Sequence, residues 1–131
     1  MAVNKTLFRP FLSKRELLEL LNRDHSLNGG VVFGIEGRVI ELQARAVSVF
    51  DEPCPWRNAV EISGMAGSVV REALSRISGA FAKLRVPEPQ VEILINLAPA
   101  DLPKDGTWLD LPLAIIMLQA AGLLPDLAEH K

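Results

Sequence analysis

Residues 91–124, VEILINLAPADLPKDGTWLDLPLAIIMLQAAGLL, decide the fold because they hold the two most apolar segments of the chain. The first segment, Val91–Leu97, is a short apolar run with turn-forming residues on both sides, which predicts a buried strand. A loop is predicted over residues 98–107, where proline, glycine and aspartate are frequent.

The second segment predicts an apolar helix from about Trp108 or Asp110 to Ala121, with Gly122 as its C-cap. Polar residues and Pro112 interrupt this run, and it is shorter than the roughly 20 apolar residues of a membrane span. We therefore expect a helix buried in the core of a globular domain.

Upstream of these segments, the hydrophobic period changes at Gly64. Residues 58–63 predict a strand. Residues 67–84 predict an amphipathic helix of about five turns, because apolar residues recur there at three- and four-residue steps. Those apolar residues are Val69, Val70, Ala73, Leu74, Ile77, Ala80, Phe81 and Leu84.

A β-hairpin is predicted before that strand. Its first strand is Val31–Gly37 and its second is Arg38–Phe50, with the turn at Glu36–Gly37. The two prolines of residues 51–55 predict a loop after the hairpin.

The N-terminal residues predict a helix that ends near Asp24. Ser13 and Glu16 have the spacing of a capping box, and Asn28-Gly29-Gly30 has the composition of a turn. Leucines follow the cap at helical spacing, and we expect them to pack on the chain's own domain, with packing on a partner as the alternative: Leu17, Leu18, Leu20 and Leu21.

Together these elements predict a mixed α/β (α+β) domain of order α-βββ-α-β-α, with a mixed sheet of about four strands packed against helices. We expect residues 1–30 to form an N-terminal helical extension and residues 31–127 to form the domain.

Composition limits the function classes. The chain has 131 residues, of which 49% are hydrophobic, and a formal net charge of −2 without a basic run, which argues against nucleic-acid binding. Cys54 is the single cysteine, so no disulfide within the chain and no cysteine-based zinc site can form. A lone thiol and the lack of a secretory signal predict a cytoplasmic protein that is not inserted in a membrane.

Three segments, residues 33–47, 61–77 and 91–124, carry a family resemblance. In this order they resemble the N-terminal domain of magnesium-chelatase subunit I-like AAA+ proteins of the ComM/YifB type. The resemblance covers about residues 31–127, and Asn96–Asp101 is its most specific part. It implies a fold similar to the proteolytic domain of Lon protease, which is also a ribosomal-protein-like fold.

The resemblance also implies that catalysis is absent. In Lon, Pro-Lys-Asp-Gly precedes the nucleophilic serine; here Pro103–Gly106 is followed by Trp108 at the nucleophile position, and an indole cannot attack a carbonyl. The partner lysine has no counterpart. The sequence has no Walker A motif for ATP. We therefore expect no catalytic residue, no cofactor and no metal.

The loop before the last helix is the predicted partner-binding site. A lysine, a flexible glycine and a large aromatic residue lie there next to a helix N-terminus. The alternative is that the tryptophan folds back onto the core. The predicted contact residues are Asp101, Lys104, Asp105, Gly106, Thr107 and Trp108.

Other polar residues predict structural roles. His25 and His130 have polar neighbours in the sequence, and we expect them at the surface. Asp101 and Asp105 suit turns, and Asp110 suits the N-cap of the last helix.

The function expected from the resemblance is a non-catalytic interaction module that associates with itself or with an AAA+ partner. Self-association is expected because the family's domain continues with another strand and helix, and their lack would leave a sheet edge open. The first alternative is an accessory factor in DNA uptake or recombination, and the second is a Lon-like hydrolase.

Overall fold

The computed structural model describes residues 12–33, 36–64, 67–98 and 109–124. The elements, in chain order, are α1 (Lys14–Leu20), β1 (Asp24–Phe33), β2 (Glu36–Val49), α2 (Trp56–Ala59), β3 (Val60–Ser63), α3 (Gly67–Leu84), β4 (Val91–Ala98) and α4 (Asp110–Ala120).

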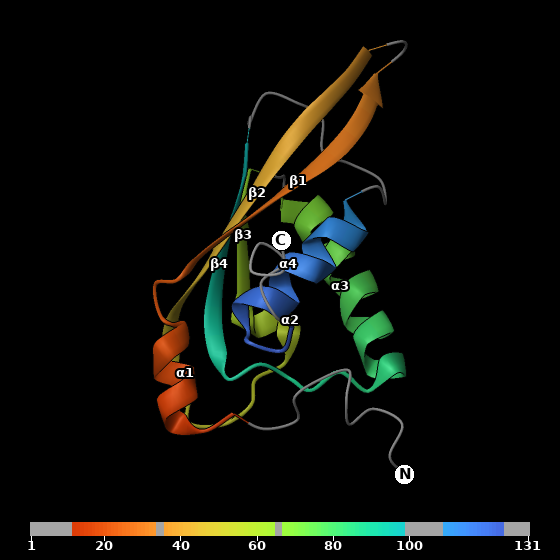
Figure 1. The fold of residues 1–131 in the computed structure, drawn as a ribbon. Coiled ribbons are helices and arrows are strands. Elements are labelled where there is room, and N and C mark those ends of the chain that lie inside the picture. Colours follow the sequence, from red (N-terminus) through yellow and green to blue (C-terminus); the bar gives the residue numbers. More distant parts are fainter. Residues whose placement is uncertain (1–11, 34–35, 65–66, 99–108, 125–131) are drawn as a thin grey trace.

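Four strands form one mixed sheet in the order β1-β2-β4-β3. β1 and β4 are both antiparallel to β2, and β3 is parallel to β4. Helices α2, α3 and α4 lie on one side of this sheet, and α1 lies near one end of β1 and β2 (Figure 1). The mixed α/β fold predicted from the sequence is confirmed.

The core lies between the sheet and α4. Ile93, Ile95 and Leu97 of β4 are each at most 2% exposed, and Leu113 and Ile116 of α4 are fully buried. α4 packs against β1 and β2 and also contacts α3, so residues on most of its circumference are buried. This confirms the predicted core helix. Within the described residues, no helix combines the length and apolar character needed to cross a bilayer.

Two positions require glycine because their backbone φ angles are positive. Gly122 has φ of 79°, its N–H donates to the Gln119 carbonyl, and the Leu123 N–H donates to the Leu118 carbonyl. These bonds form a Schellman motif at the end of α4. The C-cap is Ala121, so the glycine predicted as the C-cap lies one residue beyond it. Gly64 has φ of 98°, and a Cβ there would lie 2.6 Å from the Leu97 carbonyl oxygen.

The N-terminal region differs from the prediction. The capping box is confirmed, and so is the packing of Leu17 and Leu20 into the core with Leu21 against it. The same expectation was wrong for Leu18, which is 51% exposed. However, α1 ends at Leu20, and residues 28–30 pair with residues 39–41 of β2, so the predicted turn there was wrong. A continuous ten-residue ladder with β2 outweighs the local turn preference of Asn-Gly-Gly.

The same ladder moves the hairpin turn. Phe33 pairs with Glu36 and Val32 with Gly37, so Glu36 and Gly37 belong to β2 and not to the predicted turn. The hairpin itself is confirmed. The short helix α2 was not predicted; it buries Trp56, whose ring meets Phe81 edge-on with centroids 5.0 Å apart.

Candidate functional site

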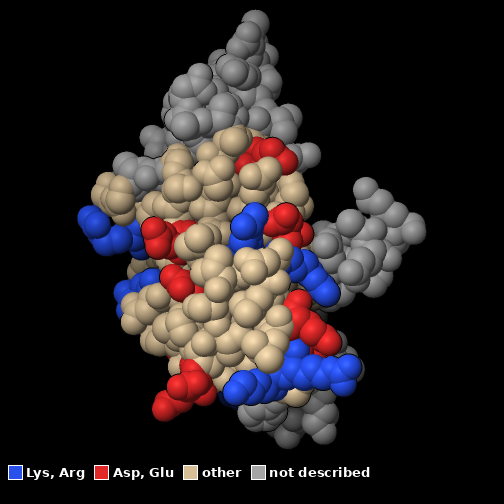
Figure 2. All heavy atoms as spheres, turned by 90° about the vertical axis from the view of Figure 1, so that its left-hand side faces the viewer, with Lys and Arg blue, Asp and Glu red and all other residues tan. Residues whose placement is uncertain are grey.

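One side of the sheet carries no described helix, and we call it the open face. It faces the viewer in Figure 2, where acidic and basic side chains lie among uncharged ones. Side chains alternate along a strand, so every second residue of each strand points to this side. The members of the open face are Asp24, Ser26, Glu41, Gln43, Arg45, Glu61, Ser63, Glu92, Leu94 and Asn96.

A row of uncharged hydrogen-bonding side chains crosses all four strands of the open face. The register places Ser26 beside Gln43, Gln43 beside Asn96, and Asn96 beside Ser63. The Ser63 hydroxyl lies 2.8 Å from Asn96 Oδ1 and donates to it. With Leu94 and neighbouring residues, this row lines a shallow hollow of about 420 Å³. Such a surface offers both donors and acceptors to a partner.

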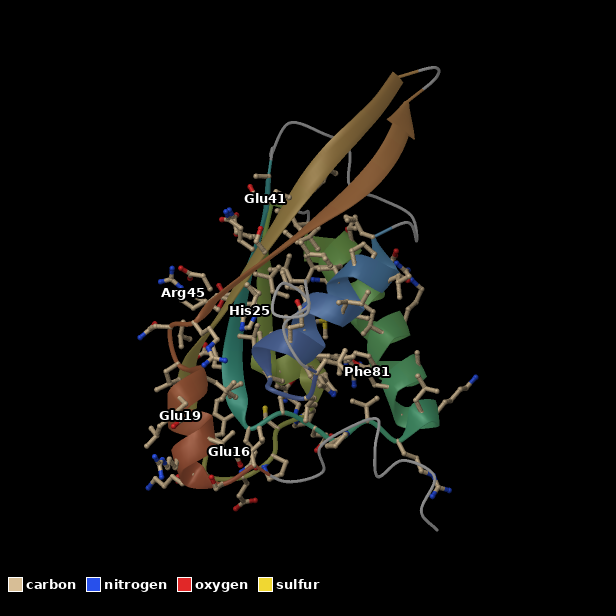
Figure 3. All side chains as sticks on the ribbon, in the orientation of Figure 1. Glu16, Glu19, His25, Glu41, Arg45 and Phe81 are labelled. Carbon is tan, nitrogen blue, oxygen red and sulfur yellow. The ribbon has the colours of Figure 1, made fainter. Side chains whose placement is uncertain are left out.

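Charged side chains flank that row. The Arg45 guanidinium lies 3.0 Å from Asp24, and the Ser26 hydroxyl donates to Glu41 over 3.0 Å. Four carboxylates and one guanidinium give the open face a net charge of −3. Figure 3 shows Glu41 and Arg45 on the side of the sheet away from the helices. This charge is of the wrong sign for a phosphate backbone.

His25 was predicted at the surface, and that prediction was wrong. Its side chain is 5% exposed, because β1 directs His25 to the covered side while Asp24 and Ser26 point to the open face. His25 lies opposite Ala44, which is also buried. The polar residues beside it in the sequence concealed this alternation.

Asp110 was predicted as the N-cap of the last helix, and that assignment was also wrong. Leu109 is the N-cap and makes no side-chain hydrogen bond. The Asp110 carboxylate instead receives two bonds from Arg76 of α3, at 2.6 and 3.0 Å. Hydrogen bonding to this carboxylate raises the pKa of the Arg76 guanidinium above its already high value. The pair therefore ties α4 to α3.

The other predicted site residues lie outside the described part of the chain. They are Asp101, Lys104, Asp105, Gly106, Thr107, Trp108 and His130. In the described ranges, no group of three or more histidine, cysteine, aspartate or glutamate side chains is arranged to hold a metal ion.

A second hollow, of about 550 Å³, lies between the two helices that follow β2, and we call it the α2–α3 groove. The sequence pattern predicted neither this groove nor the open face, because the open face joins residues of four strands and the groove forms only where α2 packs beside α3. The groove is lined by Arg57, Asn58, Ser68, Arg71, Glu72, Leu74 and Ser75.

Comparison with known proteins places residues 55–130 in a family. They match the model described as subunit ChlI of Mg-chelatase. The uncharacterized protein YifB of Escherichia coli is 45% identical over 61 residues, and the competence protein ComM of Haemophilus influenzae is 43% identical over 61. Each alignment covers 47% of this chain and 12% of the relative, so the chain matches about an eighth of those proteins.

Proposed function

Because this chain belongs to the family of subunit ChlI of Mg-chelatase and is an AAA+-related protein, we propose that it is a non-catalytic interaction module. It associates with copies of itself or with an AAA+ ATPase of the ComM type. The observation that carries the proposal is the open face, a four-stranded surface of hydrogen-bonding side chains on which no described helix packs.

The absence of catalysis is part of the proposal and is supported by the sequence. The position of the Lon nucleophile holds Trp108, and the chain has no Walker A motif. The one carboxylate that the structure describes near that position, Asp110, is engaged by Arg76. The expected results are no peptide cleavage and no ATP hydrolysis by this chain alone.

The open face suits a protein partner for a physical reason. Ser63, Asn96 and Gln43 keep polar groups at the surface. Leu94 adds apolar area next to this row, with 41% of its surface exposed. Interfaces combine a partly apolar centre with polar groups that exchange water for partner hydrogen bonds.

The test is a binding measurement with defined components. Sedimentation velocity follows the purified chain alone and mixed with a purified ComM-type ATPase. We expect self-association at micromolar to millimolar concentration, or complex formation with the ATPase. In Leu94→Arg, which places a charge in the centre of the open face, we expect at least a tenfold loss of affinity. Ser68→Arg, on the opposite side of the molecule, is the control for the complex with the ATPase.

Two results would contradict the proposal. One is a chain that stays monomeric and ignores the ATPase; the other is turnover of a peptide or of ATP by the chain alone. A Lys104→Ala, Trp108→Ala double variant tests the predicted partner-binding loop in the same assay. Lost affinity there, with Leu94→Arg unaffected, would move the binding site from the open face to the loop.

A second candidate is an accessory role in DNA uptake or recombination. The observation in its favour is the name of the Haemophilus relative, competence protein ComM. The net charge of −3 on the open face counts against direct DNA contact there. Fluorescence anisotropy with single- and double-stranded DNA at low salt decides this point, and we expect no binding.

A further inference from the structure

Two surfaces of opposite charge lie on opposite sides of this molecule. The open face carries a net charge of −3, as described above. The outer side of α2 and α3, up to Arg85, carries Arg57, Arg71, Lys83 and Arg85 against Glu72, while Arg76 is paired with Asp110. These side chains sum to +3, and the lining of the α2–α3 groove itself carries +1, from Arg57 and Arg71 against Glu72.

Helices α2 and α3 lie on the covered side of the sheet, with α4 between the sheet and α3 (Figure 1). A single copy cannot bring the two surfaces together, because the sheet lies between its open face and these helices. Two copies can, and surfaces of complementary charge steer such an encounter and fix its orientation.

We infer that the open face of one copy docks on the α2–α3 groove of a second copy. This inference rests on the proposed function and specifies which surfaces meet in self-association. The contact is heterologous, because each copy binds one neighbour through its open face and another through its groove. Repeated contacts of this kind build a ring or a filament.

The side chains at these surfaces fit such a contact. Glu61 of β3 is exposed, lies beside Leu94 in the register, and makes no ion pair within the described residues. On the other surface, Arg57 and Arg71 line the groove. The Arg71 guanidinium lies over the start of α3, where one of its nitrogens would be 3.7 Å from a Cβ added at Gly67. Arginine pairs with carboxylates through two parallel hydrogen bonds.

The area of the open face sets the affinity that we expect between two copies. Strands about 4.8 Å apart, three of them with about eight residues of 3.3 Å each and β3 with four, span roughly 450 Å². Stable interfaces bury about 800 Å² per partner, and transient ones bury less. The association is therefore expected at micromolar to millimolar concentration, and to weaken as salt rises.

The experiment uses charge reversal on each surface. Glu61→Arg changes the open face and Arg71→Glu changes the groove; both residues are exposed, so both variants are expected to fold, and circular dichroism checks this. In sedimentation velocity, each variant alone should lose self-association at least tenfold. An equimolar mixture should recover it, because arginine at position 61 then meets glutamate at position 71. Glu19→Arg, the same charge change on α1, is the control.

Each remaining outcome overturns the inference. Normal association of Arg71→Glu indicates a symmetric contact of open face on open face. If both variants lose self-association and their mixture does not recover it, residues 61 and 71 of neighbouring copies do not meet. A wild-type chain that binds the ATPase but is monomeric at about 1 mM leaves the proposed function standing and removes this inference. A chain that binds neither itself nor the ATPase removes both.

Discussion

The two faces of the sheet share the same strands and differ in what they hold together. Along β4, Ile93 and Ile95 face the helices and are at most 2% exposed, while Leu94 and Asn96 face outward and are exposed. The covered face buries the apolar surface that stabilises the fold. The open face contributes little to that burial, so its side chains are free to serve recognition.

The sharpest test of this difference compares two neighbours on β4. Ile95→Ala should lower the free energy of unfolding by about 2–5 kcal/mol, because it leaves a cavity in the core. Leu94→Ala should lower it by less than about 1 kcal/mol, because the side chain is 41% exposed. Urea unfolding followed by circular dichroism measures both. Equal losses would mean that the open face is covered in solution.

The second test concerns the backbone where β3 ends. Gly64→Ala should cost about 2–4 kcal/mol, because φ is 98° and the new Cβ would lie 2.6 Å from the Leu97 carbonyl oxygen. Gly79→Ala is the matched control: it lies in α3 with no atom within 4 Å of its added Cβ, and it should stabilise the chain by about 0.5–1 kcal/mol. A tolerated Gly64→Ala would contradict this packing of β3 on β4.

The smallest expected effect belongs to the open face itself. Ser63→Ala removes the 2.8 Å hydrogen bond to Asn96 and should cost about 0.5–1 kcal/mol, since water can replace an exposed partner. The same urea titration, with Ser75→Ala on α3 as control, measures it. A loss above about 2 kcal/mol would assign the polar row a structural role.

The sequence predicted those elements that periodic patterns define over one segment. The helix Gly67–Leu84 has the predicted bounds, and the strand that begins at Val91 and the helix that begins at Asp110 match within a residue or two. The capping box at Ser13 and the glycine with positive φ at Gly122 were also predictable, because each depends on a few neighbouring residues.

The candidate site was beyond the reach of such patterns. The polar row joins Ser26 to Ser63 through β2 and β4, and the groove joins α2 to α3. The polar row spreads over residues 26–96, so no short window of the sequence contains it. The groove lies within residues 57–75, but it exists only because α2 packs beside α3. The loop that sequence analysis favoured, residues 101–108, stays a prediction.

What the sequence determined by itself was the fold class, the buried helix and strand of residues 91–124, and the family. Only the tertiary structure decided that Asn28-Gly29-Gly30 continues a strand, that His25 is buried, and that Asp110 bonds to Arg76. The physical reason is common to all three. Each depends on a partner at least 9 residues away in β2, in the core or in α3, or on burial that such partners create. Short-range propensity carries no information about those contacts.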